Sequence, residues 1–156
     1  MTDRAALAKL TDEIVACRAC PRLVEWRERV AVEKVARFRD EAYWGKPLPG
    51  FGDPDGRILI IGLAPAAHGG NRTGRVFTGD KSGDFLWAAL HKADLADRPS
   101  SRRADDGLTL ADTYIAAAVR RIAGVGRSGA FHRYLSRRRA SRRSTTTRPM
   151  RPMTTR

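Results

Sequence analysis

The segment from residue 58 to residue 90 constrains the fold most, because it joins an apolar run to a helix through a glycine-rich loop. The run Ile58–Ile61 is short and rich in β-branched residues, and Gly56 and Gly62 bound it. This pattern predicts a fully buried strand of a parallel sheet. The loop after it contains Pro65 and several glycines, which allow sharp turns and a close approach of the backbone to a ligand.

The loop leads into a predicted helix that ends near Ala93. Ser82 is the expected cap, and Asp84 lies in the positive first turn. The apolar residues expected on one face of this helix are Phe85, Leu86, Ala89, Leu90 and Ala93. Because ligands of open α/β sheets bind at the carboxyl ends of strands, the loop is the candidate functional segment.

The loop fits neither the Walker phosphate-binding pattern nor the G-x-G-x-x-G dinucleotide pattern. From the residues alone, a purely structural strand–loop–helix corner is an alternative. The order of the residues nevertheless resembles the first motif of the family 5 uracil-DNA glycosylases, the iron–sulfur members of their superfamily. The resemblance lies in the opening Gly62-Leu63-Ala64-Pro65 and the close Asn71-Arg72-Thr73-Gly74-Arg75-Val76-Phe77-Thr78-Gly79-Asp80.

This resemblance implies roles for individual residues. Phe77 matches the aromatic position that stacks on an extruded uracil, and Asp80 matches the carboxylate that positions water and stabilises positive charge on the sugar. Without the resemblance, Asp80 reads as a loop carboxylate or a helix cap. Arg72 and Arg75 are candidates for DNA phosphate contacts. The remaining substrate-binding candidates are Gly62, Leu63, Ala64, Pro65, Ala66, His68 and Asn71.

Cys17 and Cys20 are the two cysteines of the chain. Their spacing allows both thiolates to bind one metal, but zinc binding, a redox pair and buried thiols are open alternatives. The surrounding Cys-x-x-Cys-Pro-Arg-Leu sequence also resembles family 5, which implies that Cys17 and Cys20 are ligands of a [4Fe–4S] cluster. Because such a cluster needs four ligands and this chain has two cysteines, we expect that it does not assemble here.

The rest of the first 120 residues reads as helices, an ordered loop and a second strand. Helices are predicted over residues 3–16, with Thr2 as cap, and over residues 23–39, where the charges of mixed sign indicate a solvated face. Residues 43–54 are rich in aromatics, glycine and proline and are predicted to form an ordered loop. Residues 113–119 are predicted to form a buried strand, with a helix as the alternative.

The charge of +13 resides almost entirely in the carboxyl-terminal segment. Residues 1–118 contain 18 Lys and Arg and all 17 Asp and Glu, whereas residues 119–156 contain the other 12 basic residues, all Arg, and no acid. We expect residues 121–156 to be a disordered tail. We interpret it as the product of a reading-frame slip near Arg121; an Arg-rich arm that binds phosphates is the alternative.

The resemblance covers about residues 5–120, so the sequence predicts a partial uracil-DNA glycosylase-like domain over residues 1–120 and the tail over 121–156. The expected fold is an incomplete three-layer α/β/α arrangement around a parallel sheet. We expect a monomeric cytoplasmic protein without membrane spans, whose partner is uracil-containing DNA, and which is inactive in this form. A nucleic-acid-binding module that acts through the tail and a non-functional truncated product are the alternatives.

Overall fold

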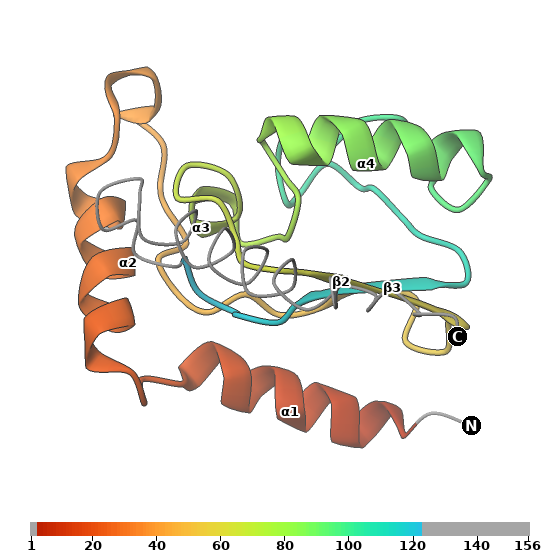
Figure 1. Cartoon of the computed structure of the whole chain (residues 1–156), viewed down its shortest axis with the longest axis horizontal. Helices are drawn as coiled ribbons and strands as arrows, with labels where there is room; N and C mark the ends of the chain where they lie inside the picture. The colour runs from red at the N-terminus through yellow and green to blue at the C-terminus, as the bar shows by residue number, and fades with distance from the viewer. Residues whose placement is uncertain (1–2, 123–156) are drawn as a thin grey trace, which may run out of the picture. The chain divides into compact units, whose positions relative to one another are not determined.

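The computed structural model describes residues 3–122, and the Arg-rich tail expected from residue 121 lies almost wholly outside this range. Helix α4 lies on one side of the sheet and helix α1 on the other (Figure 1). This layering confirms the predicted α/β class for the described part. The elements in chain order are α1 (Arg4–Ala16), α2 (Pro21–Glu33), the 3₁₀ helix η1 (Ala36–Phe38), β1 (Phe51–Gly52), β2 (Ile58–Gly62), α3 (Gly70–Thr73), α4 (Lys81–Lys92) and β3 (Thr113–Ala117).

The sheet has the strand order β1-β3-β2. Strands β2 and β3 pair in parallel, with Ile60 opposite Ile115, as expected for strands that are joined through a helix. This pairing confirms the strand prediction for residues 113–117 and excludes the helical alternative. Strand β1 adds two residues in antiparallel register to β3, so the sheet is mixed.

The core lies between the sheet and α4. Trp87 and Leu90 of α4 pack with Ile115 of β3, and the Trp87 side chain is completely buried. The predicted helix is therefore present, but its predicted inner face is partly wrong. Phe85, which was expected to be buried, is 78% exposed, because the buried positions of α4 are Gly83, Trp87 and Leu90.

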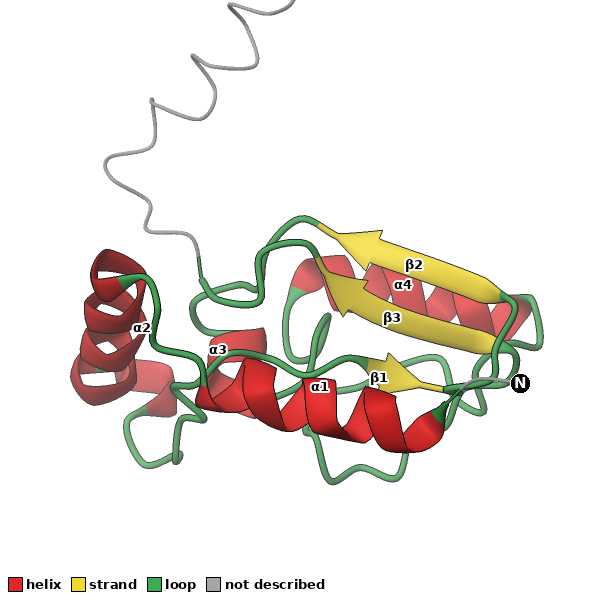
Figure 2. Ribbon diagram, turned by 90° about the horizontal axis from the view of Figure 1, so that it is seen from below, coloured by secondary structure: helices red, strands yellow, loops and turns green. Residues whose placement is uncertain are grey.

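Strand β2 is not the fully buried strand that its sequence predicts. Ile60 packs against the core, whereas Leu59 and Ile61 are each 61% exposed. The physical reason is visible in Figure 2, where β2 forms the outer strand of the sheet and α1 runs along β1 instead. The alternating side chains of β2 therefore have cover on one face only.

Helix α1 is present as predicted, but its cap is Asp3, whose carboxylate accepts a hydrogen bond from the Ala6 N–H at 3.0 Å. The predicted cap, Thr2, lies outside the described residues. Helix α2 ends at Glu33, so the predicted continuation to residue 39 is wrong. Lys34 has a φ of 53°, which a helix cannot accommodate.

The predicted solvated face of α2 does not include Arg27. Its side chain is 2% exposed and donates a hydrogen bond to the Cys17 carbonyl at 3.4 Å. Further along the chain, residues 43–54 are ordered, and Trp44 and Gly45 donate backbone hydrogen bonds to the loop after β2. In the described part of the chain, no helix is long and apolar enough to cross a membrane.

Candidate functional site

The loop between β2 and α4 turns sharply at several positions with positive φ. Gly74 ends α3 with a φ of 83°, and Phe77 and Gly79 follow with φ values of 51° and 73°. A positive φ is uncommon for a residue with a side chain, so the Phe77 backbone must be held by its surroundings. The Phe77 carbonyl accepts a hydrogen bond from Trp87 Nε1 at 2.6 Å, which ties this position to the core.

The Phe77 ring lies against the end of β2. A Cβ atom added to Gly62 would lie 2.7 Å from Phe77 Cζ, so a side chain there would require the Phe77 ring to shift. At Gly83 the constraint is stronger, because a Cβ atom there would lie 1.9 Å from the Phe77 carbonyl oxygen, a backbone atom. The two glycines therefore position an aromatic ring beside the first residues of the loop.

Asp80 caps α4, and its two carboxylate oxygens have different surroundings. Oδ1 accepts a hydrogen bond from the Gly83 N–H at 2.9 Å, so Asp80, not Ser82, caps the helix. Oδ2 faces Gly69, where an added Cβ atom would lie 2.3 Å away. Asp80 Oδ2 is therefore directed toward the backbone of Gly69, in the loop between β2 and α4.

A cavity of about 1190 Å³ opens beside Asp80. Its walls come from three segments: the loop after β2, the start of α4, and the region around η1 and the 102–105 turn. Phe77 and residues 62–65 are not among the lining residues, so the structure does not join every predicted substrate-binding residue in one cavity. The predicted residues that line it are Ala66, His68, Arg72 and Asp80.

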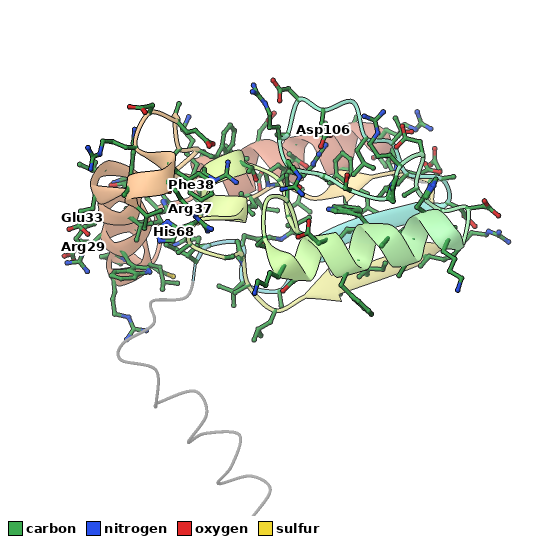
Figure 3. The ribbon with its side chains drawn as sticks, turned by 90° about the horizontal axis from the view of Figure 1, so that it is seen from above. Arg29, Glu33, Arg37, Phe38, His68 and Asp106 are labelled. Carbon is green, nitrogen blue, oxygen red and sulfur yellow. The ribbon has the colours of Figure 1, made fainter. Side chains whose placement is uncertain are left out.

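His68 is held in the cavity wall by Tyr43. Their hydroxyl and Nδ1 atoms share a hydrogen bond of 3.1 Å, and the two rings meet edge to face. Burial lowers the pKa of His68, and the positive charges of Arg37 and Arg72 lower it further. His68 is therefore neutral at pH 7. Figure 3 shows Arg37, Phe38 and His68 grouped beside α3.

Sequence patterns do not identify the contact of His68 with Tyr43, because the two residues are 25 positions apart. The aromatic character of the 43–54 loop is the only local signal for it.

Asn71, Arg72 and Arg75 are buried, with exposed fractions of 2%, 7% and 5%. Asn71 donates a hydrogen bond to the Arg27 carbonyl at 3.3 Å. Arg72 pairs with Glu41 at 2.5 Å and donates to the His68 carbonyl at 2.9 Å. These contacts give Asn71 and Arg72 an internal structural role that the sequence does not indicate.

Arg75 is neutralised inside the protein. Its Nη2 atom contacts the Asp106 carboxylate at 2.5 Å, and its Nε atom donates to Thr78 at 3.1 Å. The guanidinium group also lies over the Phe51 ring, 4.6 Å from its centroid. Because its donors are used internally, these contacts do not support the predicted phosphate contact of Arg75.

Cys17 and Cys20 flank the turn between α1 and α2, as the C-cap of one and the N-cap of the other. Cys17 Sγ accepts a hydrogen bond from Arg121 at 2.7 Å. A hydrogen bond from the Ala19 backbone lowers the pKa of the Cys17 thiol, and the charges of Arg121 and Arg27 lower it further.

The residues present do not fit a [4Fe–4S] cluster. Such a cluster requires four ligands, the chain has two cysteines, and residues 3–122 contain no group of three or more His, Cys, Asp or Glu placed to hold a metal.

Comparison with known proteins gives the same family as the loop motif. The family model of the Uracil DNA glycosylase superfamily matches residues 49–149, a range that contains β2, the loop, α4 and β3 and continues beyond the described residues.

Several relatives carry the name type-5 uracil-DNA glycosylase. The protein from Mycobacterium leprae is 57% identical over 115 residues, which are 74% of this chain and 50% of the relative. The protein from Thermus thermophilus is 60% identical over 107 residues, 69% of this chain and 48% of the relative. The protein from Pyrobaculum aerophilum is 44% identical over 119 residues, 76% of this chain and 52% of the relative. The chain therefore spans about half the length of these relatives.

Proposed function

Because the chain belongs to the uracil-DNA glycosylase superfamily, we propose that it derives from an enzyme that hydrolyses the N-glycosidic bond of uracil in DNA. Other deaminated bases are further candidate substrates. The activity is proposed for the whole protein, since this chain spans about half the length of its relatives. The observation that carries the proposal is the cavity beside Asp80, which the loop between β2 and α4 helps to line.

The chemistry requires a base that has left the helical stack, because the glycosidic bond is not accessible inside a duplex. The cavity of about 1190 Å³ beside Asp80 has room for the sugar of the extruded nucleotide, and the base would lie toward Phe77 and residues 62–65, outside the cavity lining. We assign Asp80 to water positioning and to stabilisation of positive charge on the sugar. Oδ2 supports this role, because it is directed toward the loop at Gly69, whereas Oδ1 accepts the hydrogen bond of the helix cap.

We assign the backbone of residues 62–66 to the uracil edge, where N–H groups hydrogen-bond the base and stabilise the departing anion. Phe77 is assigned to stacking on the uracil ring. Its position against Gly62 supports this assignment, since the ring and the loop backbone meet at the end of β2.

His68 binds the substrate as a neutral group in this proposal and does not act as a general acid. The lowered pKa of His68 supports the neutral state, because a neutral imidazole lacks the extra proton that a general acid would donate. Asn71 and Arg72 support the loop from within.

We further propose that the 156-residue chain assembles no [4Fe–4S] cluster and does not release uracil by itself. Two cysteines supply half of the required ligands, and half of the length of the relatives is not represented in the match. Cytoplasmic location and a monomeric state remain expectations for the whole protein.

A second candidate function is nucleic-acid binding through the carboxyl-terminal segment. Residues 119–156 contain 12 Arg and no acidic residue, a composition that favours contacts with phosphates of any sequence. This activity would be independent of Asp80 and of the cavity.

A binding comparison separates the two candidates. The full chain is titrated with two single-stranded oligonucleotides that are identical except for one uracil or one thymine. Their phosphates are the same, so the Arg-rich segment contributes equally to both affinities. The glycosylase proposal predicts tighter binding of the uracil strand and loss of this preference in Asp80→Asn or Phe77→Ala. Equal affinities of the unmodified chain for the two strands would contradict the glycosylase proposal.

A further inference from the structure

The His68 imidazole uses one of its two nitrogens within the described part of the chain. Nδ1 shares a hydrogen bond of 3.1 Å with the Tyr43 hydroxyl, whereas residues 3–122 provide no hydrogen-bond partner for Nε2. His68 lines the cavity beside Asp80, and Tyr43 is not among the lining residues. Tyr43 therefore binds the imidazole from outside the cavity lining, and Nε2 is the nitrogen that is left for a bound molecule.

The direction of the hydrogen bond between Tyr43 and His68 follows from the surroundings of the hydroxyl group. Burial raises the pKa of Tyr43, so the hydroxyl keeps its proton at pH 7. Among the described residues, His68 Nδ1 is the acceptor that this proton can reach. A smaller contribution, a hydrogen-bonding contact from the Val35 backbone, lowers the same pKa, which requires a donor directed at the hydroxyl oxygen. The oxygen thus accepts from Val35, and the hydroxyl donates to Nδ1.

This direction sets the tautomer of His68. A neutral imidazole that accepts a hydrogen bond at Nδ1 carries its proton at Nε2. His68 is neutral at pH 7, because burial and then the charges of Arg37 and Arg72 lower its pKa. The rings of Tyr43 and His68 meet edge to face with centroids 6.1 Å apart, so the same contact also holds the plane of the imidazole. His68 thus supplies one N–H donor without a positive charge.

An uncharged donor suits a site in which positive charge develops on a sugar. A protonated imidazole beside the sugar would oppose the charge that Asp80 is assigned to stabilise, whereas a neutral N–H group binds an oxygen without this cost. We propose that Tyr43 is a positioning residue that holds His68 as the Nε2–H tautomer, and that Nε2 donates to an oxygen atom of the extruded nucleotide. This inference rests on the proposed function, because it assigns one atom of the same site.

The first test measures the tautomer of His68 in the full chain without DNA. Nitrogen-15 NMR of the histidine side chains distinguishes the two neutral tautomers at a pH well above the ordinary histidine pKa of about 6.5. The signals of His68 are those that disappear in His68→Gln. The unmodified chain should show the Nε2–H tautomer, and Tyr43→Phe should show a mixture of the two.

The control for this measurement is Tyr114→Phe. It removes a hydroxyl on β3, outside the cavity lining, and should leave the tautomer of His68 unchanged. The Nδ1–H tautomer in the unmodified chain, or the same tautomer in Tyr43→Phe as in the unmodified chain, would overturn the role of Tyr43.

The second test is a double-mutant cycle. The quantity measured is the ratio of the affinities for single-stranded oligonucleotides that contain one uracil or one thymine. His68→Gln should lower this ratio about three- to tenfold, because one hydrogen bond to the nucleotide is lost. Tyr43→Phe should also lower it, and the double variant should lower it no further than His68→Gln alone, since Tyr43 acts through His68.

The outcomes separate this inference from the proposed function. Additive losses in the double variant, or an unchanged ratio in His68→Gln, would overturn the inference while the preference for uracil in the unmodified chain still supported the function. A ratio of one in the unmodified chain would contradict the proposed function and, with it, the nucleotide as the ligand of Nε2. The NMR measurement would then still decide whether Tyr43 sets the tautomer of His68.

Discussion

The charge of Arg75 is used inside the fold. Its guanidinium group contacts Asp106, Ser101 and Thr78, and it stacks on Phe51. These partners connect the loop after β2 to the 101–106 turn. The arginine therefore fixes the backbone that leads to Asp80, which is a structural contribution to the site.

Replacing Arg75 with methionine should destabilise the protein strongly, because Asp106 would lose its positive partner in a largely buried position. We expect a loss of about 3–5 kcal/mol in the free energy of unfolding, measured by urea denaturation. The control is Arg103→Met, which removes an exposed ion pair with Asp105 and should change stability little. Equal effects of the two variants would show that Arg75 is not a buried structural charge.

His68 gives the site a pH dependence with a definite sign. Its pKa is lowered in the folded protein, mainly by burial and then by Arg37 and Arg72. The unfolded chain therefore binds a proton at pH values where the folded protein does not. Stability is retained above the ordinary histidine pKa of about 6.5 and falls as the pH drops below it.

The measurement is the urea midpoint between about pH 7.5 and pH 5.5, compared with His68→Gln. The unmodified chain should lose more stability over this interval than the variant, which has no titrating group at this position. Carboxylates such as Asp97, whose pKa is lowered, contribute only at more acidic pH. Identical pH profiles of the two proteins would refute the assignment of a neutral, buried His68.

At the scale of elements, α4 connects the core to the site. One face buries Trp87 against the sheet, and the Trp87 indole also donates to the Phe77 carbonyl. The first residue before the helix, Asp80, supplies the cap. The same helix therefore positions Phe77 and Asp80, two of the residues that we assign to the substrate.

The orientation of α4 predicts a large loss of stability on truncating one of its two large aromatic side chains and almost none on truncating the other. Trp87→Ala should cost about 3–5 kcal/mol in the free energy of unfolding, because it opens a cavity in the core. Phe85→Ala should change it by no more than about 0.5 kcal/mol, because Phe85 is 78% exposed. Chemical denaturation of both variants checks this, and a large loss in Phe85→Ala would contradict the orientation of α4.

The cap of α4 provides a second test. Asp80→Ala should lose about 1 kcal/mol of stability, Asp80→Asn much less, and Ser82→Ala almost none. The order follows from the hydrogen bond between Asp80 Oδ1 and the Gly83 N–H. If Ser82→Ala were the most damaging of the three, the cap would be at the position that the sequence pattern suggested.

The elements that sequence reasoning predicted well are those with local signals. Strand β2, the loop, α4 and the pairing partner β3 follow from apolar runs and glycines that are adjacent in the chain. The burial of Arg27 and Arg75 was not predictable in this way, because their partners are ten or more positions away. The exposure of β2 depends on which segments cover the sheet. A short apolar run in the sequence does not distinguish a strand that is covered on both faces from one that is covered on one face only.

At the scale of the whole molecule, the described part has a small three-stranded sheet in which β2 is an edge strand. The core between the sheet and α4 is well packed, whereas the outer face of β2 is exposed. The chain also spans about half the length of its relatives and has two cysteines. These observations agree with a domain of the uracil-DNA glycosylase superfamily that includes the loop between β2 and α4 and spans part of the length of its relatives.

The most direct test of this account is a glycosylase assay on the purified chain, with the iron content of the same sample measured alongside. The substrate is a single-stranded oligonucleotide with one uracil, and alkaline cleavage detects the abasic site. We predict no uracil release above that of Asp80→Asn and no iron–sulfur absorbance. Release that requires Asp80, from a chain carrying a full [4Fe–4S] cluster, would contradict the account.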